Sequence, residues 1–105
     1  MSTTAYTMRV STDAFSPAIR RDWFVVADPE SLCTPGELVV LQQRGRAATV
    51  QRLVRTCAAS IVCEPAAGGA ARTIARDEIE HMDLVAAVVP PSRWRAVTKV
   101  EGVRP

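Results

Sequence analysis

The chain has 105 residues, of which 48% are hydrophobic and 23% charged, and its formal net charge is +2. This length suits a single domain, and no apolar run reaches the roughly 18 residues of a membrane-spanning helix. We therefore expect no membrane partner. A charge this small does not indicate a nucleic-acid-binding surface, because such domains carry a clear basic excess. The chain has one histidine, His81, and one lysine, Lys99, while its other basic residues are arginines, which stay protonated. A histidine- or lysine-based mechanism must use one of these two.

The cysteines and the N-terminus indicate the cellular compartment. Three cysteines are an odd number, which excludes a complete disulfide framework. The first eight residues lack the apolar core of a signal peptide. We therefore expect a cytoplasmic protein with reduced thiols.

Short β-branched runs between turn residues predict an all-β domain. The predicted strands cover residues 23–27, 37–43, 47–56, 60–63 and 84–89. Alternation within 47–56 puts Val50 and Arg52 on one face and Gln51 and Leu53 on the other. The tight connection at 57–59 predicts a hairpin.

Helical signals are few. Residues 16–20 predict one turn, with Ser16 as the N-cap and Pro17 in the first helical position. Residues 77–82 predict a second short turn, and 64–70 a flexible loop. We place the domain at residues 1–90 and a C-terminal tail or arm at 91–105. In this tail, Trp94 lies between two arginines and is a candidate anchor for a partner.

Four segments of the first half follow a distinctive order. They are Val-Ser-Thr-Asp-Ala-Phe-Ser-Pro at 10–17, Ile-Arg-Arg-Asp-Trp-Phe-Val-Val-Ala-Asp-Pro at 19–29, Pro-Gly-Glu-Leu-Val-Val at 35–40 and Thr-Val-Gln-Arg-Leu at 49–53. Their order and spacing resemble the C-terminal domain of the LexA and phage-repressor family, a serine–lysine self-cleaving peptidase family with the signal-peptidase fold. The resemblance implies a mostly β fold of coiled sheets, with a small barrel-like core and few short helical turns.

The departures from the family pattern bear on activity. Ala14 occupies the place of the family's nucleophilic serine, and Gln51 the place of its general-base lysine. Alanine has no hydroxyl, and a glutamine amide accepts no proton at useful pH. Arg21 replaces the glycine that precedes Asp22 in the family pattern. The resemblance therefore implies a degenerate, non-catalytic member.

By this resemblance, the former cleft is lined by Asp13, Ala14, Phe15, Gln51 and Arg52. We expect an oligomerisation domain of a prophage or LexA-type transcriptional regulator, acting as a homodimer. In that family a separate helix-turn-helix domain binds DNA, and these 105 residues contain no such motif, so any contact with DNA would be indirect.

Two alternatives stay open. The first is a stand-alone binding module that holds a peptide or protein in the former cleft. The second is an active self-cleaving peptidase with unorthodox residues, for which Ser11 and Ser16 are the candidate nucleophiles, although neither has a base opposite it.

No metal or other cofactor is expected. The Glu78-x-x-His81 spacing can bind a metal when both side chains face inward, but there is no second histidine. An acidic surface turn containing Glu80 and Asp83 explains this cluster better. Cys57 and Cys63 flank the predicted hairpin, where a tight turn would place Cys57 opposite Ser60, so no bridge is expected.

Overall fold

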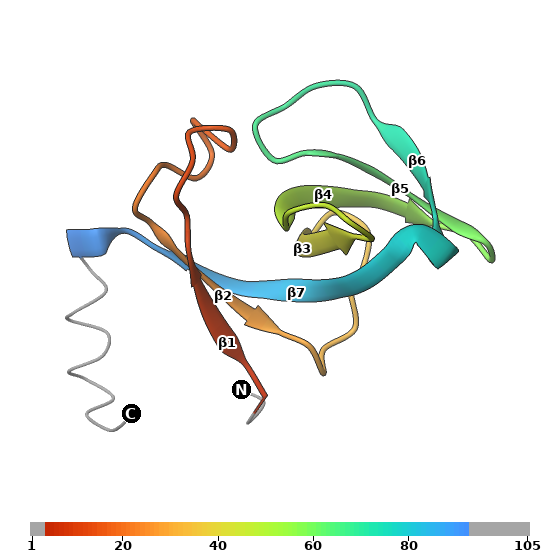
Figure 1. Cartoon of the computed structure of the whole chain (residues 1–105), viewed down its shortest axis with the longest axis horizontal. Coiled ribbons are helices and arrows are strands. Elements are labelled where there is room, and N and C mark those ends of the chain that lie inside the picture. Colours follow the sequence, from red (N-terminus) through yellow and green to blue (C-terminus); the bar gives the residue numbers. More distant parts are fainter. Residues whose placement is uncertain (1–3, 93–105) are drawn as a thin grey trace.

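The structure is a computed structural model that describes residues 4–92 and consists mainly of β-strands (Figure 1). In chain order the elements are β1 (Tyr6–Arg9), β2 (Phe24–Asp28), β3 (Leu38–Gln43), β4 (Thr49–Thr56), β5 (Ser60–Pro65), β6 (Arg72–Ala75), the 3-10 turn η1 (Arg76–Glu78) and β7 (Ile79–Val89). The predicted all-β class is confirmed.

All seven strands form one antiparallel sheet in the order β1-β2-β7-β3-β4-β5-β6. Strands β3 to β6 pair with their neighbours in the chain. The long β7 then returns to the middle of the sheet and lies between β2 and β3. Its first part pairs with β3 and its second part with β2, so this one strand joins the two halves of the sheet.

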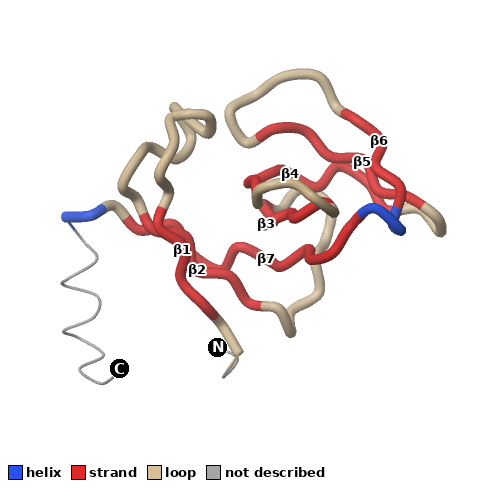
Figure 2. The backbone as a smooth tube through the Cα atoms, in the orientation of Figure 1, coloured by secondary structure: helices blue, strands red, loops and turns tan. Residues whose placement is uncertain are grey.

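The expected barrel-like core is wrong in one respect, because the sheet does not close. Strands β1 and β6 are its two edges, and they lie at opposite ends of the curved sheet (Figure 2). Irregularities in the register occur between β2 and β7, between β3 and β7, and between β4 and β5. Such bulges bend and twist a sheet locally. The result is an open, coiled sheet.

Two hydrophobic cores lie on opposite faces of the central strands. The first core consists of Val10, Phe15, Ile19, Val25, Ala27, Val40 and Val50. The second core consists of Val39, Leu41, Leu53, Ile61, Cys63 and Ile74. Successive side chains of a strand point to opposite faces, so adjacent residues of β3 enter different cores. Burial on both faces explains why this strand is a continuous apolar run.

Strands β2 to β5 confirm four of the predicted strands, with ends shifted by up to two residues. The short edge strands β1 and β6 were not among the predicted strands. The predicted loop at 64–70 begins later than expected, because β5 continues to Pro65.

The helical turn predicted at 77–82 is wrong beyond Glu78, because β7 begins at Ile79. In the register of β7 with β3, Gln42 pairs with His81 and Gln43 pairs with Ile79, which leaves Glu80 as an extra residue. The bulge turns Ile79 and Met82 toward the same core although they are three residues apart. This spacing imitates the periodicity of a helix.

The loop between β1 and β2 forms turns at 14–18, where the sequence predicted one helical turn capped by Ser16. The backbone N–H of Ser16 donates to Asp13 O at 3.0 Å, and that of Ile19 donates to Phe15 O at 3.0 Å. The hydroxyl that caps a turn here belongs to Thr12, whose Oγ1 accepts a hydrogen bond from the N–H of Ala14.

Trp94 and Lys99 of the tail lie outside the described residues. Across residues 4–92, a search for a helix with the length and apolar character needed to cross a membrane finds none.

Candidate functional site

The β1–β2 loop holds Asp13, Ala14 and Phe15, three of the residues that the resemblance predicted to line a cleft. Ala14 is exposed, whereas the next residue, Phe15, is buried in the first core together with Val50 of β4. Asp13 is exposed and forms an ion pair with Arg21 at 3.3 Å. Phe15 therefore anchors the loop to the face of the sheet on which the side chain of Val50 lies.

Gln51 lies on the opposite face of β4 from Val50. Its strand partner is Val39, a residue of the second core, and directly paired residues share a face. The predicted alternation of residues 49–53 is thus confirmed. The structure places Gln51 on the second-core side, while Phe15, the neighbour of Ala14, packs on the first-core side.

The side chain of Gln51 is buried, with only 6% of its surface exposed. Its Nε2 donates a hydrogen bond to Thr49 Oγ1 at 3.0 Å. Its Oε1 is buried and has no hydrogen-bond partner among residues 4–92. A buried oxygen without a donor carries a desolvation penalty of about 1–3 kcal/mol. Gln51, predicted by the resemblance to replace a lysine, is therefore a buried, neutral amide held by Thr49.

Arg52, the last of the residues expected to line the cleft, lies on β4, and its side chain bonds to the backbone just before β3. Its Nη1 donates to Gly36 O at 3.0 Å, and its Nε lies 3.9 Å from Glu64 Oε1. Arg52 pairs with Leu38, so it shares the face of the first core with Phe15. Its charge is engaged by a neighbouring carboxylate.

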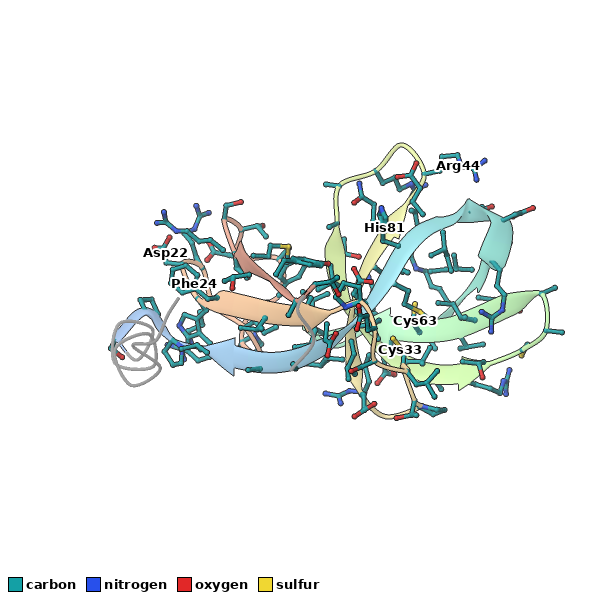
Figure 3. The ribbon with its side chains drawn as sticks, turned by 90° about the horizontal axis from the view of Figure 1, so that it is seen from below. Asp22, Phe24, Cys33, Arg44, Cys63 and His81 are labelled. Atoms are coloured by element: carbon teal, nitrogen blue, oxygen red, sulfur yellow. The ribbon has the colours of Figure 1, made fainter. Side chains whose placement is uncertain are left out.

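A separate open cavity of about 440 Å³ lies on the first-core face of the sheet. It is lined by Tyr6, Met8, Pro29, Val40, Gln42, Ala48, His81 and Asp83. The register of β3 with β7 builds one wall, because Val40 pairs with Asp83 and Gln42 pairs with His81. Figure 3 shows His81 of β7 beside the end of β3, near the β3–β4 turn that contains Arg44.

Tyr6 and Asp83 form the polar centre of this cavity. The Tyr6 hydroxyl donates a hydrogen bond of 2.6 Å to Asp83 Oδ2. Burial raises the pKa of Tyr6 well above its usual value of about 10, and the hydrogen bond and negative charge of Asp83 raise it further. Asp83 is only 8% exposed. The pair is therefore a neutral phenol held against a buried carboxylate.

This cavity was missed by sequence reasoning, which interpreted His81 and Asp83 as parts of an acidic surface turn. That interpretation is wrong for Asp83, which is buried on a strand, whereas Glu78 and Glu80 are exposed. The local signal was the spacing of His81 and Asp83, which puts both on one face of a strand. Tyr6 is 77 residues from Asp83, and no local pattern links them.

The cysteines are free thiols in three different environments. Cys57 is exposed, and its N–H donates to Ser60 O at 2.8 Å, which confirms the predicted tight turn. Burial raises the pKa of both Cys33 and Cys63. Within the described part of the chain, no group of three or more His, Cys, Asp or Glu side chains could hold a metal ion.

No protein-family model matches the chain, and no curated protein matches it.

Proposed function

We propose that the chain is a non-catalytic domain of a LexA-type transcriptional regulator that associates with a second copy of itself. The proposal includes a cytoplasmic location, where its free thiols stay reduced. The observation that carries it is the state of Gln51, a buried amide bonded to Thr49 at the position of the family's general base.

The proposed lack of peptidase activity follows from the chemistry of the two positions. Ala14 offers no hydroxyl, and the Gln51 amide cannot remove a proton from a nucleophile. The side chain of Gln51 also leaves β4 on the face opposite to the one against which Phe15 packs. A hydroxyl restored at position 14 would still lack a base.

Self-association is supported by the open sheet. Within residues 4–92, strands β1 and β6 each have one partner strand, so each leaves backbone N–H and C=O groups along its outer edge. A second copy can extend the sheet by pairing edge to edge around a two-fold axis. The family that the chain resembles uses the same domain for dimerisation.

Light scattering of the full chain at micromolar concentration tests this proposal. We expect the mass of a dimer, with dissociation on dilution. A monomer mass at every accessible concentration would reject self-association and leave the inactive-peptidase part to be judged separately.

Prolonged incubation at alkaline pH, followed by mass spectrometry, tests the lack of activity. We expect the full mass to persist. A discrete fragment in the wild-type chain that disappears in the Ser11→Ala/Ser16→Ala variant would show that an unorthodox serine is active. A fragment that persists in this variant would also reject the proposal, by assigning cleavage to another group.

A second candidate function, a binding module, is favoured by the cavity around Asp83.

A further inference from the structure

We propose that the cavity between β1, β3 and β7 binds the arginine side chain of a peptide or protein segment, with Asp83 as its counter-charge. The residues that line this site do not include Ala14 or Gln51.

Asp83 has no ion-pair partner within the described residues. Among residues 4–92 the ion pairs are Arg9–Asp22, Arg21–Asp13 and Arg52–Glu64, and none includes Asp83. Tyr6 satisfies Oδ2 with a neutral hydroxyl, which leaves the negative charge without a cation. A buried charge without a partner of opposite sign is costly. A cation from outside the described chain would remove this cost.

The hydrogen-bond acceptors of the cavity lining suit a guanidinium better than an ammonium. Gln42 uses its Nε2 to donate to Arg46 O at 3.2 Å, which leaves its Oε1 as an acceptor in the cavity lining. Asp83 contributes its second carboxylate oxygen. A guanidinium carries several N–H donors in a planar fork, so it can bond to both residues at once and stack on the ring of Tyr6.

Four of the remaining lining residues are apolar. Met8, Val40 and Ala48 pack against or belong to the first core, and together with Pro29 they form the cavity's apolar wall. The aliphatic stem of an arginine buries itself along such a wall while its head group reaches a polar centre. The cavity is open to solvent, so the main chain of the ligand can stay outside.

His81 also lines the cavity, where it pairs with Gln42 of β3. All binding measurements are therefore compared at a single, fixed pH.

The test is an NMR titration of the full-length protein with the peptide acetyl-Gly-Arg-Gly-amide. The control ligand replaces arginine by citrulline, which has the same shape without the charge. We expect saturable shifts at the resonances of Tyr6 and Asp83 with the arginine peptide, and binding at least tenfold weaker with citrulline. Equal binding of the two peptides, or no binding of either, overturns the proposal.

Variants localise the site. Asp83→Asn keeps the shape of the side chain and is expected to weaken binding about tenfold or more, since a hydrogen bond to a charged group contributes about 1.5–3 kcal/mol. The matched control, Glu80→Gln, removes an exposed acid of the same strand outside the cavity and should leave binding unchanged. Equal losses in both variants would indicate general charge attraction and reject the site.

The peptide pair requires only the wild-type protein, so it decides the proposal even if Asp83→Asn fails to fold. A lysine peptide and free arginine complete the series. Binding of free arginine as tight as that of the peptide would make the ligand a small cation rather than a protein segment and would overturn the assignment.

Discussion

The two cores differ in the sequence distance over which they are assembled. Most of the second core comes from β3 to β6, which follow one another as antiparallel hairpins, and the start of β7 completes it. The first core joins β1, β2 and their connecting loop to β3, β4 and the distant end of β7. The loop with Ala14 and the cavity with Asp83 both belong to the side of the first core. Hairpins between neighbouring strands thus form an apolar unit, while pairing between segments distant in the sequence creates the cavity with Asp83.

The largest expected effect comes from truncation in the second core. Ile61 is fully buried, so Ile61→Ala should lower the free energy of unfolding by about 2–5 kcal/mol. Ile19→Ala in the first core should fall at the lower end of that range, because Ile19 belongs to a loop that can relax. Urea denaturation measures both values.

We expect the two cores to unfold together, because β3 and β7 belong to both. Trp23 packs against the first core, so in a Trp94→Phe background its fluorescence reports on that core. In the Ile61→Ala/Trp94→Phe variant, we expect unfolding followed by Trp23 fluorescence to coincide with unfolding followed by circular dichroism. Two separated transitions would show that the cores are independent units.

A smaller effect of opposite sign is expected at Gln51. Gln51→Leu removes the buried Oε1 that has no partner, which should remove a desolvation penalty of about 1–3 kcal/mol. The hydrogen bond to Thr49 that is lost contributes less, about 0.5–1.5 kcal/mol. We therefore expect net stabilisation by about 1 kcal/mol in urea denaturation. The control Gln43→Leu, at a half-buried amide, should change stability by less than about 0.5 kcal/mol. Destabilisation by Gln51→Leu would mean that Oε1 has a donor.

Tyr6 offers a spectroscopic measure of the cavity, because it is the only tyrosine of the chain. Absorbance at alkaline pH should show a tyrosinate transition above the usual pKa of about 10, and Asp83→Asn should lower this raised pKa only in part, because burial, the larger cause of the shift, remains. Since the folded-state pKa is raised, the contribution of Tyr6 to stability is present below about pH 10 and is lost as the pH rises through the folded-state value. An unshifted transition in the wild-type protein would contradict the bond to Asp83.

The smallest effect is expected at the surface of the β1–β2 region. Arg9 and Asp22 form an exposed ion pair at 2.7 Å, so Arg9→Gln should cost less than about 1 kcal/mol, and high salt should reduce that cost. Arg21→Gln, which breaks the exposed pair with Asp13, serves as the matched comparison. A cost above this range at Arg9 would show that the pair also fixes the positive φ of Asp22.

Strands β2 to β5 could be predicted because their signals are local. Each is a short β-branched run next to turn residues, and Gly36 and Gly45, both at positive φ, lie in the connections before and after β3. The alternation within β4 correctly assigned Gln51 and Leu53 to one face. For such segments the backbone period and the turn chemistry suffice.

The remaining features depended on distant pairing. β1 and β6 have four residues each, too few for a clear pattern. The bulge at Glu80 gave the start of β7 a helical spacing, and only the partner strand β3 resolves that ambiguity. The sequence by itself determined the strand-rich character of the chain and the absence of a side-chain hydroxyl at Ala14. Tertiary structure alone decided that Tyr6 meets Asp83, because a contact across 77 residues depends on the order of strands in the sheet.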